Sequence, residues 1–204
     1  MMETTSKKIH INQLGYRPND VKTVKVPGAY EAFYVFDCDT EQVAYEGCFG
    51  AAKPDRGAYE SVVSGDFTEL TEPGRYVVQV PELGHSYEFT IAKDVYSELS
   101  TAVLKMLYYQ RCGVDLTEEY AGQWSHPTCH TDLGELYGAG TTFDGSGGWH
   151  DAGDYGKYTV PAARTVADLF LAYRLYPDAF GDDTLIPESG NGLPDILDEA
   201  RAGG

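Results

Sequence analysis

Apolar and polar residues alternate in short runs along the first half of the chain. Each run is bounded by Gly, Pro, Asn or Asp, which is typical of half-buried strands joined by turns. The runs cover residues 8–12, 21–26, 33–37, 42–47, 57–64, 74–80 and 86–92. Seven short strands at this spacing predict a two-sheet β-sandwich of the immunoglobulin-like kind over residues 7–92.

The period of the pattern changes from two to about 3.6 after Ala92. A stripe at helical spacing runs through Val95, Leu99, Ala102, Val103, Met106, Leu107 and Gln110, with Asp94 as a potential cap and Gly113 as a stop. A second helix is predicted over residues 158–176, with Pro177 ending it. A third begins at Pro194, and its apolar residues have few partners left in the sequence. The pattern over residues 94–204 therefore predicts a separate helical domain.

Composition narrows the classes of partner. The 204 residues carry 32 acidic and 15 basic side chains, a net charge of −17, which repels phosphate backbones and anionic lipid. No apolar run approaches the ~20 residues that a membrane-spanning helix needs. We therefore expect no nucleic-acid partner and no membrane partner. Residues 1–8 are polar and contain no apolar signal region.

Four potential metal ligands lie in the Gly-rich segment between the first two predicted helices: Cys112, Cys129, His130 and His150. Two thiolates and two imidazoles can form a closed tetrahedral Zn²⁺ site of the structural type. Such a site would organise residues 113–157, a connection longer than compact domains usually leave without structure. The alternative is that these residues bind no metal. Cys112 would then pack at a helix end, Cys129 would be a thiol in the loop, and His130 and His150 would lie on the surface.

Asp151 and Asp154 follow His150 and are separated only by Ala152 and Gly153. Small residues let the backbone turn so that both carboxylates face one ligand. One carboxylate could then orient a water while the other takes its proton. The alternative is a pair of aspartates that interact with the first-turn amides of the helix near Tyr158.

Three stretches of sequence carry a resemblance to a known family. GGWHDAGDYGKY at 147–158 resembles the signature of family 9 glycoside hydrolases, the inverting cellulases with an (α/α)6 barrel. HINQLGY at 10–16 resembles the opening of the immunoglobulin-like domain that precedes the catalytic domain in one branch of that family. GLPDILDE at 192–199 resembles a later barrel helix. The implied fold is multidomain: an all-β immunoglobulin-like sandwich over 7–92, followed by the N-terminal portion of an all-α (α/α)6 barrel over 94–204.

The resemblance also implies catalytic roles. Asp154 matches the general base of the family, and Asp151 matches the second aspartate that helps to hold the nucleophilic water. The general acid of the family is a glutamate near the C-terminus of the full barrel, and no residue of this chain aligns with it. Glu188 and Glu199 are therefore not assigned that role. The implied function is endo-acting hydrolysis of β-1,4-glucosidic bonds in cellulose or related β-glucans. This chain is expected to be an N-terminal fragment of such an enzyme and to be inactive alone.

The same resemblance implies a cofactor. Cys112, Cys129, His130 and His150 match a zinc site found in this branch of the family. With His150 on the metal, zinc would act indirectly, by fixing the backbone from which both Asp151 and Asp154 project. Calcium is also conceivable, but the sequence locates no site for it.

Several further expectations concern ligands and partners. Four aromatic residues lie close in sequence to the candidate sites and could stack on a glucosyl ring, although core packing is the alternative for each: Trp124, Trp149, Tyr155 and Tyr158. The expected substrate is a β-glucan or cello-oligosaccharide, and the sandwich is expected to pack on the catalytic domain. Cys38 and Cys48 are compatible with a cross-strand disulfide or with two free thiols.

Two other functions remain open at this point. One is an exo-acting family 9 glycosidase on another β-linked sugar. The other is a non-catalytic carbohydrate-binding or structural module, in which the acidic turn is only a cap or a calcium site. Secretion is implied by the resemblance, whereas the polar N-terminus leaves a cytoplasmic location possible.

Overall fold

The computed structural model describes residues 5–57 and 59–203. Ala58, inside the strand predicted over 57–64, lies outside these residues, as do residues 1–4 of the polar N-terminal segment. The chain divides into two compact units, residues 1–98 and 99–204. Each unit has its own hydrophobic core, and each is described separately below.

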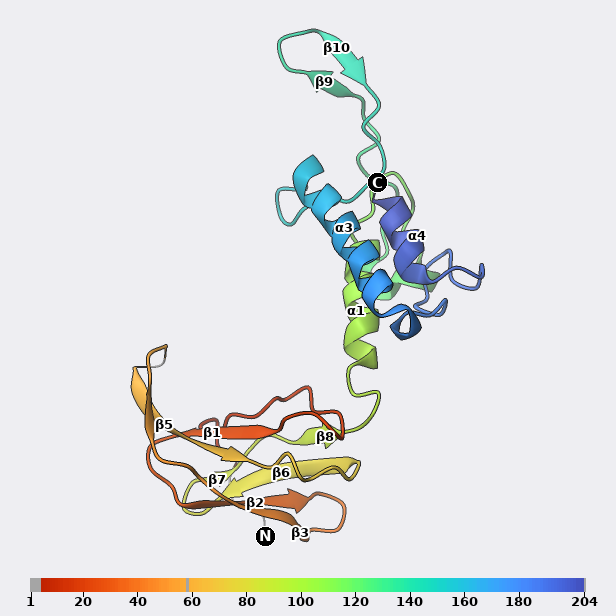
Figure 1. Ribbon diagram of the computed structural model, residues 1–204. Coiled ribbons are helices and arrows are strands. Elements are labelled where there is room, and N and C mark those ends of the chain that lie inside the picture. The colour runs from red at the N-terminus through yellow and green to blue at the C-terminus, as the bar shows by residue number, and fades with distance from the viewer. Residues whose placement is uncertain (1–4, 58, 204) are drawn as a thin grey trace. The chain divides into compact units, whose positions relative to one another are not determined.

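The first unit is built from two antiparallel sheets that lie in layers (Figure 1). One sheet has the order β1–β5–β4, with β1 at Thr23–Pro27, β5 at Glu60–Asp66 and β4 at Lys53–Asp55. The other has the order β3–β2–β6–β7, with β3 at Val43–Cys48, β2 at Ala32–Asp37, β6 at Gly74–Val80 and β7 at Gly84–His85, and β8 at Phe89–Ile91 also pairs with β6. This arrangement is the two-sheet sandwich that the alternating pattern predicts.

Two of the predicted strands differ in the structure. Residues 8–12 join the sheet only through a single bridge between His10 and Lys25. The strand predicted over 86–92 is shortened to β8. Ser86 bonds separately to Val78 of β6: its hydroxyl accepts from the Val78 amide, and its own amide donates to the Val78 carbonyl. β4 and the two-residue β7 were not predicted, and the sequence of β4 is polar and contains Pro54.

The sandwich core is centred on Phe33, whose side chain is fully buried between the two sheets. Its ring packs against Tyr45, Phe49 and Phe67, with centroid separations of 6.2, 5.0 and 6.4 Å. A Cβ atom at Gly65 would lie 2.2 Å from this ring, so glycine is required there by close approach. One aromatic side chain thus fills the space between both layers.

We expect Phe33→Ala to lower the free energy of unfolding of the sandwich by about 3–5 kcal/mol, because it removes a buried ring and leaves a cavity. Urea unfolding followed by tyrosine fluorescence would measure the change. Val43→Ala, an exposed position on neighbouring β3, is the control and should have little effect. An unchanged midpoint for Phe33→Ala would contradict this account of the core.

The second unit is mainly helical. Its elements are α1 (Ser97–Tyr108), α2 (Glu118–Ala121), the 3₁₀ turn η1 (Gly122–Trp124), β9 (Gly134–Leu136), β10 (Thr141–Phe143), α3 (Thr159–Leu175), the 3₁₀ turn η2 (Pro177–Ala179) and α4 (Asp195–Ala202). β9 and β10 form an antiparallel hairpin. The Gly-rich connection between α1 and α3 therefore contains short elements but no long helix.

The buried face of α1 differs from the predicted stripe. Leu104, Leu107 and Tyr108 are buried, whereas Val103 and Met106 are each 49% exposed. Leu107 packs in one cluster with Leu169 of α3 and Ile196 of α4. The sequence leaves few later partners for the third helix, but earlier residues of α1 and α3 supply them, and Ile196 is almost completely buried.

Two other sequence expectations can be compared with the structure. All four cysteines are free, so Cys38 and Cys48 are two separate thiols and form no disulfide. Among the residues that the structure describes, no helix is long and apolar enough to cross a membrane.

Candidate functional site

Residues 151–156, which include Asp151 and Asp154, form a tight turn shortly before α3. The amide of Asp151 donates to the carbonyl of Gly156 (2.8 Å), and the amide of Tyr155 donates to the carbonyl of Ala152 (3.1 Å). Tyr155 has a φ of 52°, in the left-handed region that side-chain-bearing residues rarely adopt. These bonds close the turn that carries the two aspartates, and both aspartates are exposed.

The carboxylate of Asp154 is held from two directions. Its Oδ2 accepts a hydrogen bond of 2.6 Å from the hydroxyl of Tyr158, and its Oδ1 accepts one of 3.2 Å from the amide of Gly156. Tyr158 is the residue that precedes the first turn of α3, so the helix start positions the hydroxyl. The carboxylate therefore has a defined orientation even though it faces solvent.

These hydrogen bonds also set the charge of Asp154. The Tyr158 hydroxyl, followed by the Gly156 amide, lowers the pKa of the Asp154 carboxyl below its usual value. The bond to Asp154 and the negative charge of that carboxylate raise the pKa of Tyr158, to which Asp151 adds a smaller contribution. Asp154 is therefore an ionised acceptor and Tyr158 a neutral donor near neutral pH.

Two hollows adjoin this turn. A small one of about 120 Å³ is lined by Asp151, His150 and Tyr158 together with residues of α1 and α3. A larger one of about 650 Å³ is lined by Tyr158, Lys157, His130 and Phe143 among others. Asp151 and Tyr158 therefore line the small hollow, which is large enough for water, and Tyr158 also lines the larger one, whereas Asp154 lines neither of these two hollows.

Three of the four predicted metal ligands lie together. Ligand atoms of Cys112, Cys129 and His130 are all within 4.8 Å of one another, and this is the one such group of His, Cys, Asp or Glu within residues 5–57 and 59–203. Sγ of Cys112 is 3.3 Å from Nδ1 of His130. His150 is not part of this group, but its ring stacks on His130 with a centroid separation of 5.6 Å.

In both His130 and His150, one ring nitrogen faces a backbone carbonyl. Nε2 of His130 is 2.8 Å from the carbonyl of Tyr155, and Nδ1 of His150 is 2.6 Å from that of Asp151. A metal-ligating histidine commonly donates its other ring N–H to such an acceptor. This arrangement leaves Nδ1 of His130 and Nε2 of His150 for a metal, so the donor set fits a Cys/His metal group.

The surroundings of Cys112 favour the neutral form of its thiol. Burial, followed by the neighbouring Cys129, raises the pKa of Cys112 to about 11. A metal ion that binds here must displace that proton, as thiolate ligands generally require.

The aromatic candidates lie in different surroundings. Trp149 is buried in the helical core, where its ring lies against Gly203 and its indole nitrogen donates to Glu199. Trp149 is therefore a packing residue of the core. Trp124 is exposed on η1, and Tyr155 is exposed beside the His150 ring, with a centroid separation of 4.8 Å.

Sequence reasoning missed the role of Tyr158 as hydrogen-bond donor to Asp154, treating it only as a nearby aromatic residue. The spacing of four positions is a weak signal, because the chain turns at Gly153 and Asp154 and is not helical over residues 155–158. Only the turn geometry brings the hydroxyl to the carboxylate.

Comparisons with known proteins identify the class of both units. Residues 4–85 match the model of the cellulase N-terminal ig-like domain, so the first unit is an immunoglobulin-like domain of the cellulase type. Residues 96–203 match the model of glycosyl hydrolase family 9. Because that match covers more than half of the chain, the chain belongs to glycosyl hydrolase family 9.

Individual relatives agree with this assignment. The chain is 36% identical to Endoglucanase D of Acetivibrio thermocellus over 199 residues, which are 95% of this chain and 32% of the relative. It is 40% identical to the crystal structure of a metagenome-derived glycoside hydrolase family 9 endoglucanase, with a TM-score of 0.84 over 96% of this chain and 39% of that one. A Zn-binding triple mutant of the family 9 endoglucanase J30 is 33% identical, with a TM-score of 0.81 over 91% of this chain and 37% of that one. The chain thus spans about a third of the length of the curated relatives it matches.

Proposed function

We propose that this chain is the N-terminal part of an inverting endo-β-1,4-glucanase and that it supplies the catalytic base, Asp154. The observation that carries the proposal is the Asp154 carboxylate, oriented by Tyr158 and Gly156 and kept ionised by them. The relatives named endoglucanases support cellulose or a related β-glucan as the substrate.

The mechanism assigns one step to each carboxylate. Asp154 removes a proton from a water that attacks the anomeric carbon, and Asp151, on the same turn, accepts a second hydrogen bond from that water and so orients it. An inverting reaction also needs an acid on the other side of the bond, with the carboxyl groups ~6.5–9.5 Å apart. Glu188 and Glu199 both pair with Arg111 and are not available as this acid, which we assign to a part of the enzyme outside this chain.

We also propose that the metal group binds structural zinc through Cys112, Cys129, His130 and His150. A closed site of two thiolates and two imidazoles leaves no position for a reactive water, so its contribution is to stabilise the loop. Binding would require the His150 ring to approach the three clustered ligands. Because His150 is next to Asp151, the metal would then restrict the backbone from which the acidic turn begins. Calcium binding stays a prediction without a location.

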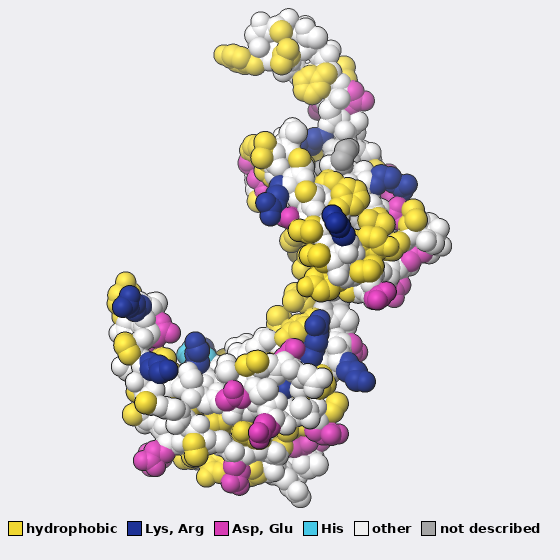
Figure 2. All heavy atoms as spheres, viewed as in Figure 1, with side chains coloured by type: hydrophobic (Ala, Val, Ile, Leu, Met, Phe, Trp, Pro, Cys, Tyr) yellow, Lys and Arg dark blue, Asp and Glu magenta, His cyan; other side chains and the backbone are white. Residues whose placement is uncertain are grey.

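The helical unit is proposed to be the first part of an (α/α)6 barrel. Apolar side chains lie exposed on its helices, including Leu99, Val103 and Met106 of α1 and Val160 and Phe170 of α3 (Figure 2). Further helices of the barrel would bury these faces. Packing of the sandwich on the completed barrel stays a prediction. We place the enzyme outside the cell, since an insoluble glucan cannot enter one.

The pH dependence of the enzyme tests the electrostatics of the base. Because the Tyr158 hydroxyl lowers the pKa of Asp154, Tyr158→Phe should raise that pKa. The base works only when ionised, so the acidic limb of the kcat/KM profile of the full-length enzyme should move to higher pH. Tyr176→Phe, at the other end of α3, is the matched control and should leave the limb in place. A profile that Tyr158→Phe does not move would argue against Asp154 as the titrating base.

The products of the full-length enzyme test the proposed reaction itself. An endo-acting enzyme should lower the viscosity of carboxymethylcellulose rapidly while releasing few reducing ends. Release of single terminal units from cello-oligosaccharides without a fall in viscosity would favour an exo-acting glycosidase. Binding of cello-oligosaccharides without any hydrolysis would favour the non-catalytic module and would contradict the proposal.

A further inference from the structure

The segments that carry Cys112 and His150 are paired side by side. Arg111 and Trp149 form an antiparallel bridge, although they are 38 positions apart in the sequence. The amide of Cys112 donates to the carbonyl of Gly148 (2.8 Å), and the amide of His150 donates to that of Gln110 (2.9 Å). Each bridged residue thus stands immediately before a proposed metal ligand.

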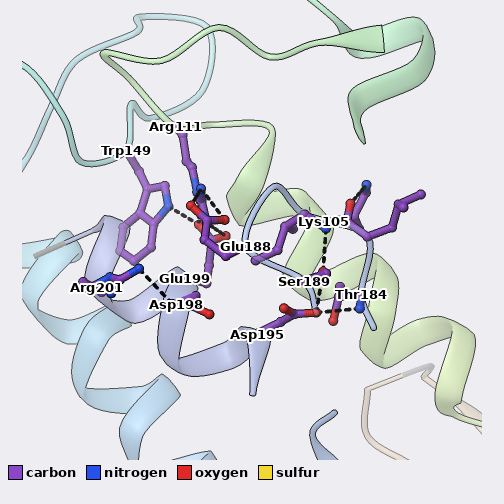
Figure 3. Close-up of polar contacts among 12 residues, drawn as sticks. Lys105, Arg111, Trp149, Thr184, Glu188, Ser189, Asp195, Asp198, Glu199 and Arg201 are labelled. Carbon is purple, nitrogen blue, oxygen red and sulfur yellow. Dashed lines mark hydrogen bonds and ion pairs between the residues drawn. The ribbon is translucent and has the colours of Figure 1, made fainter. Parts of the chain in front are cut away.

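A single carboxylate on α4 binds the side chains of both bridged residues (Figure 3). Oε1 of Glu199 accepts from the indole Nε1 of Trp149 (2.7 Å) and from Nε of Arg111 (3.2 Å). Oε2 of Glu199 accepts from Nη2 of Arg111 (2.9 Å). The side chain of Glu199 is only 1% exposed, so these contacts are made away from water.

The guanidinium of Arg111 also contacts Glu188 and Tyr108. Its Nη1 donates to both oxygens of Glu188, at 2.9 and 3.0 Å, and its Cζ lies 5.2 Å above the ring of Tyr108. A planar guanidinium held on three sides has little freedom to rotate. The side chain of Arg111 therefore transmits the position of α4 to the segment that continues into Cys112.

Stability alone does not explain a buried anion at this position. An apolar side chain of similar volume would hold α4 against the core at lower desolvation cost, so a buried ion pair is weak evidence for a purely stabilising role. A carboxylate with two oxygens can instead bind two different segments in one geometry. The contacts of Glu199 have that form, because its two partners come from the two paired segments.

We propose that Glu199 is a positioning residue that sets the register between the segments bearing Cys112 and His150 and, through His150, the place of the acidic turn. The inference rests on the proposed function for its catalytic consequence, but the pairing itself can be measured without activity. Glu199 acts through Arg111 and Trp149 and does not touch the substrate.

Hydrogen exchange of the 204-residue chain tests the pairing directly. Glu199→Gln keeps the volume but places an NH₂ group against the donors of Arg111. The amides of Cys112 and His150 should then exchange at least about tenfold faster, because the local pairing opens more often. Trp149→Phe removes the indole donor together with part of the buried ring and should raise exchange at the same two amides, which gives a second test if Glu199→Gln folds poorly.

Asp198→Asn is the matched control. Asp198 is the neighbouring residue on α4 and is equally buried, but it pairs with Arg201 and Asn191 instead of the paired segments. It should lower stability without selective exchange at Cys112 and His150. If Glu199→Gln raises exchange at these amides no more than Asp198→Asn does, the positioning role is wrong.

Kinetics of the full-length enzyme test the link to catalysis. Glu199→Gln should lower kcat about tenfold or more with KM within about twofold, because it displaces the turn without removing substrate contacts. Selective exchange with an unchanged kcat would overturn the catalytic consequence. An unmutated enzyme that cleaves no glucan would instead contradict the proposed function, and the exchange measurement would still decide whether Glu199 holds the two segments.

Discussion

Replacing Asp154 with asparagine should lower kcat of the full-length glucanase by about 10²–10⁴-fold, the range that a positioned general base contributes. The amide has nearly the same shape and can still accept the hydrogen bond from Tyr158 that the carboxylate accepts at 2.6 Å. It cannot take a proton from water. The loss should therefore appear in kcat, while KM for cello-oligosaccharides changes little.

Asp144→Asn is a suitable control for this substitution. Asp144 lies in the same connection, is also exposed, and accepts a hydrogen bond from the amide two residues later, as Asp154 does. It has no assigned role in the reaction, so kcat should stay within about twofold of the unmutated enzyme. Equal losses in both variants would mean that the loop is merely sensitive to charge, and Asp154 would lose its assignment.

Replacing Cys129 with serine should have the second largest effect, on metal binding. Loss of an outer-shell partner typically costs 10–100-fold in metal affinity, so loss of a thiolate ligand should cost at least about 100-fold. Competition with a chromophoric chelator would measure the zinc affinity of the chain. The melting temperature of the helical unit should fall as well, because the metal stabilises a loop with little apolar burial.

Cys48→Ser makes the same chemical change at an exposed position of the sandwich and should leave zinc affinity unchanged. A stoichiometry near one zinc per chain in the unmutated protein, lost in Cys129→Ser, is the predicted result. A chain that binds no zinc, or binds it equally well in both variants, would exclude the metal site.

The strands of the sandwich were the part of the fold most accessible from sequence. β2 and β6 coincide closely with the predicted runs, because their alternation reflects one buried and one outward face. The segment around His10 has the same local pattern but pairs with Lys25 at one point only. Local pattern indicates a strand-like conformation and does not show how many partners the segment will find.

The helices show a different limit of sequence reasoning. The positions of α1, α3 and α4 were predicted to within a few residues, and α2 was not predicted. The buried face of α1 was assigned wrongly, since apolar residues lie on more than one side of it. Which face is buried depends on where α3 and α4 lie, and that is tertiary information. Leu107 is buried by Ile196, which is 89 positions later in the chain.

The candidate site was predictable only in part. Asp151, Asp154 and the metal ligands stand in recognisable motifs, and the structure brings Cys112, Cys129 and His130 together. The hydroxyl of Tyr158 and the contacts of Glu199 leave no local signature, because they depend on a non-helical turn and on pairing across 88 positions.

Chemical rescue of Asp154→Ala in the full-length enzyme tests the central claim most directly. Azide is a nucleophile that needs no base to remove a proton, so it can replace the water that Asp154 would activate. Because the proposed reaction inverts the anomeric carbon, added azide should restore cleavage and yield the α-glycosyl azide, which NMR identifies. No restoration by azide, or a β-glycosyl azide as the product, would contradict the assignment of Asp154 as the base of an inverting hydrolase.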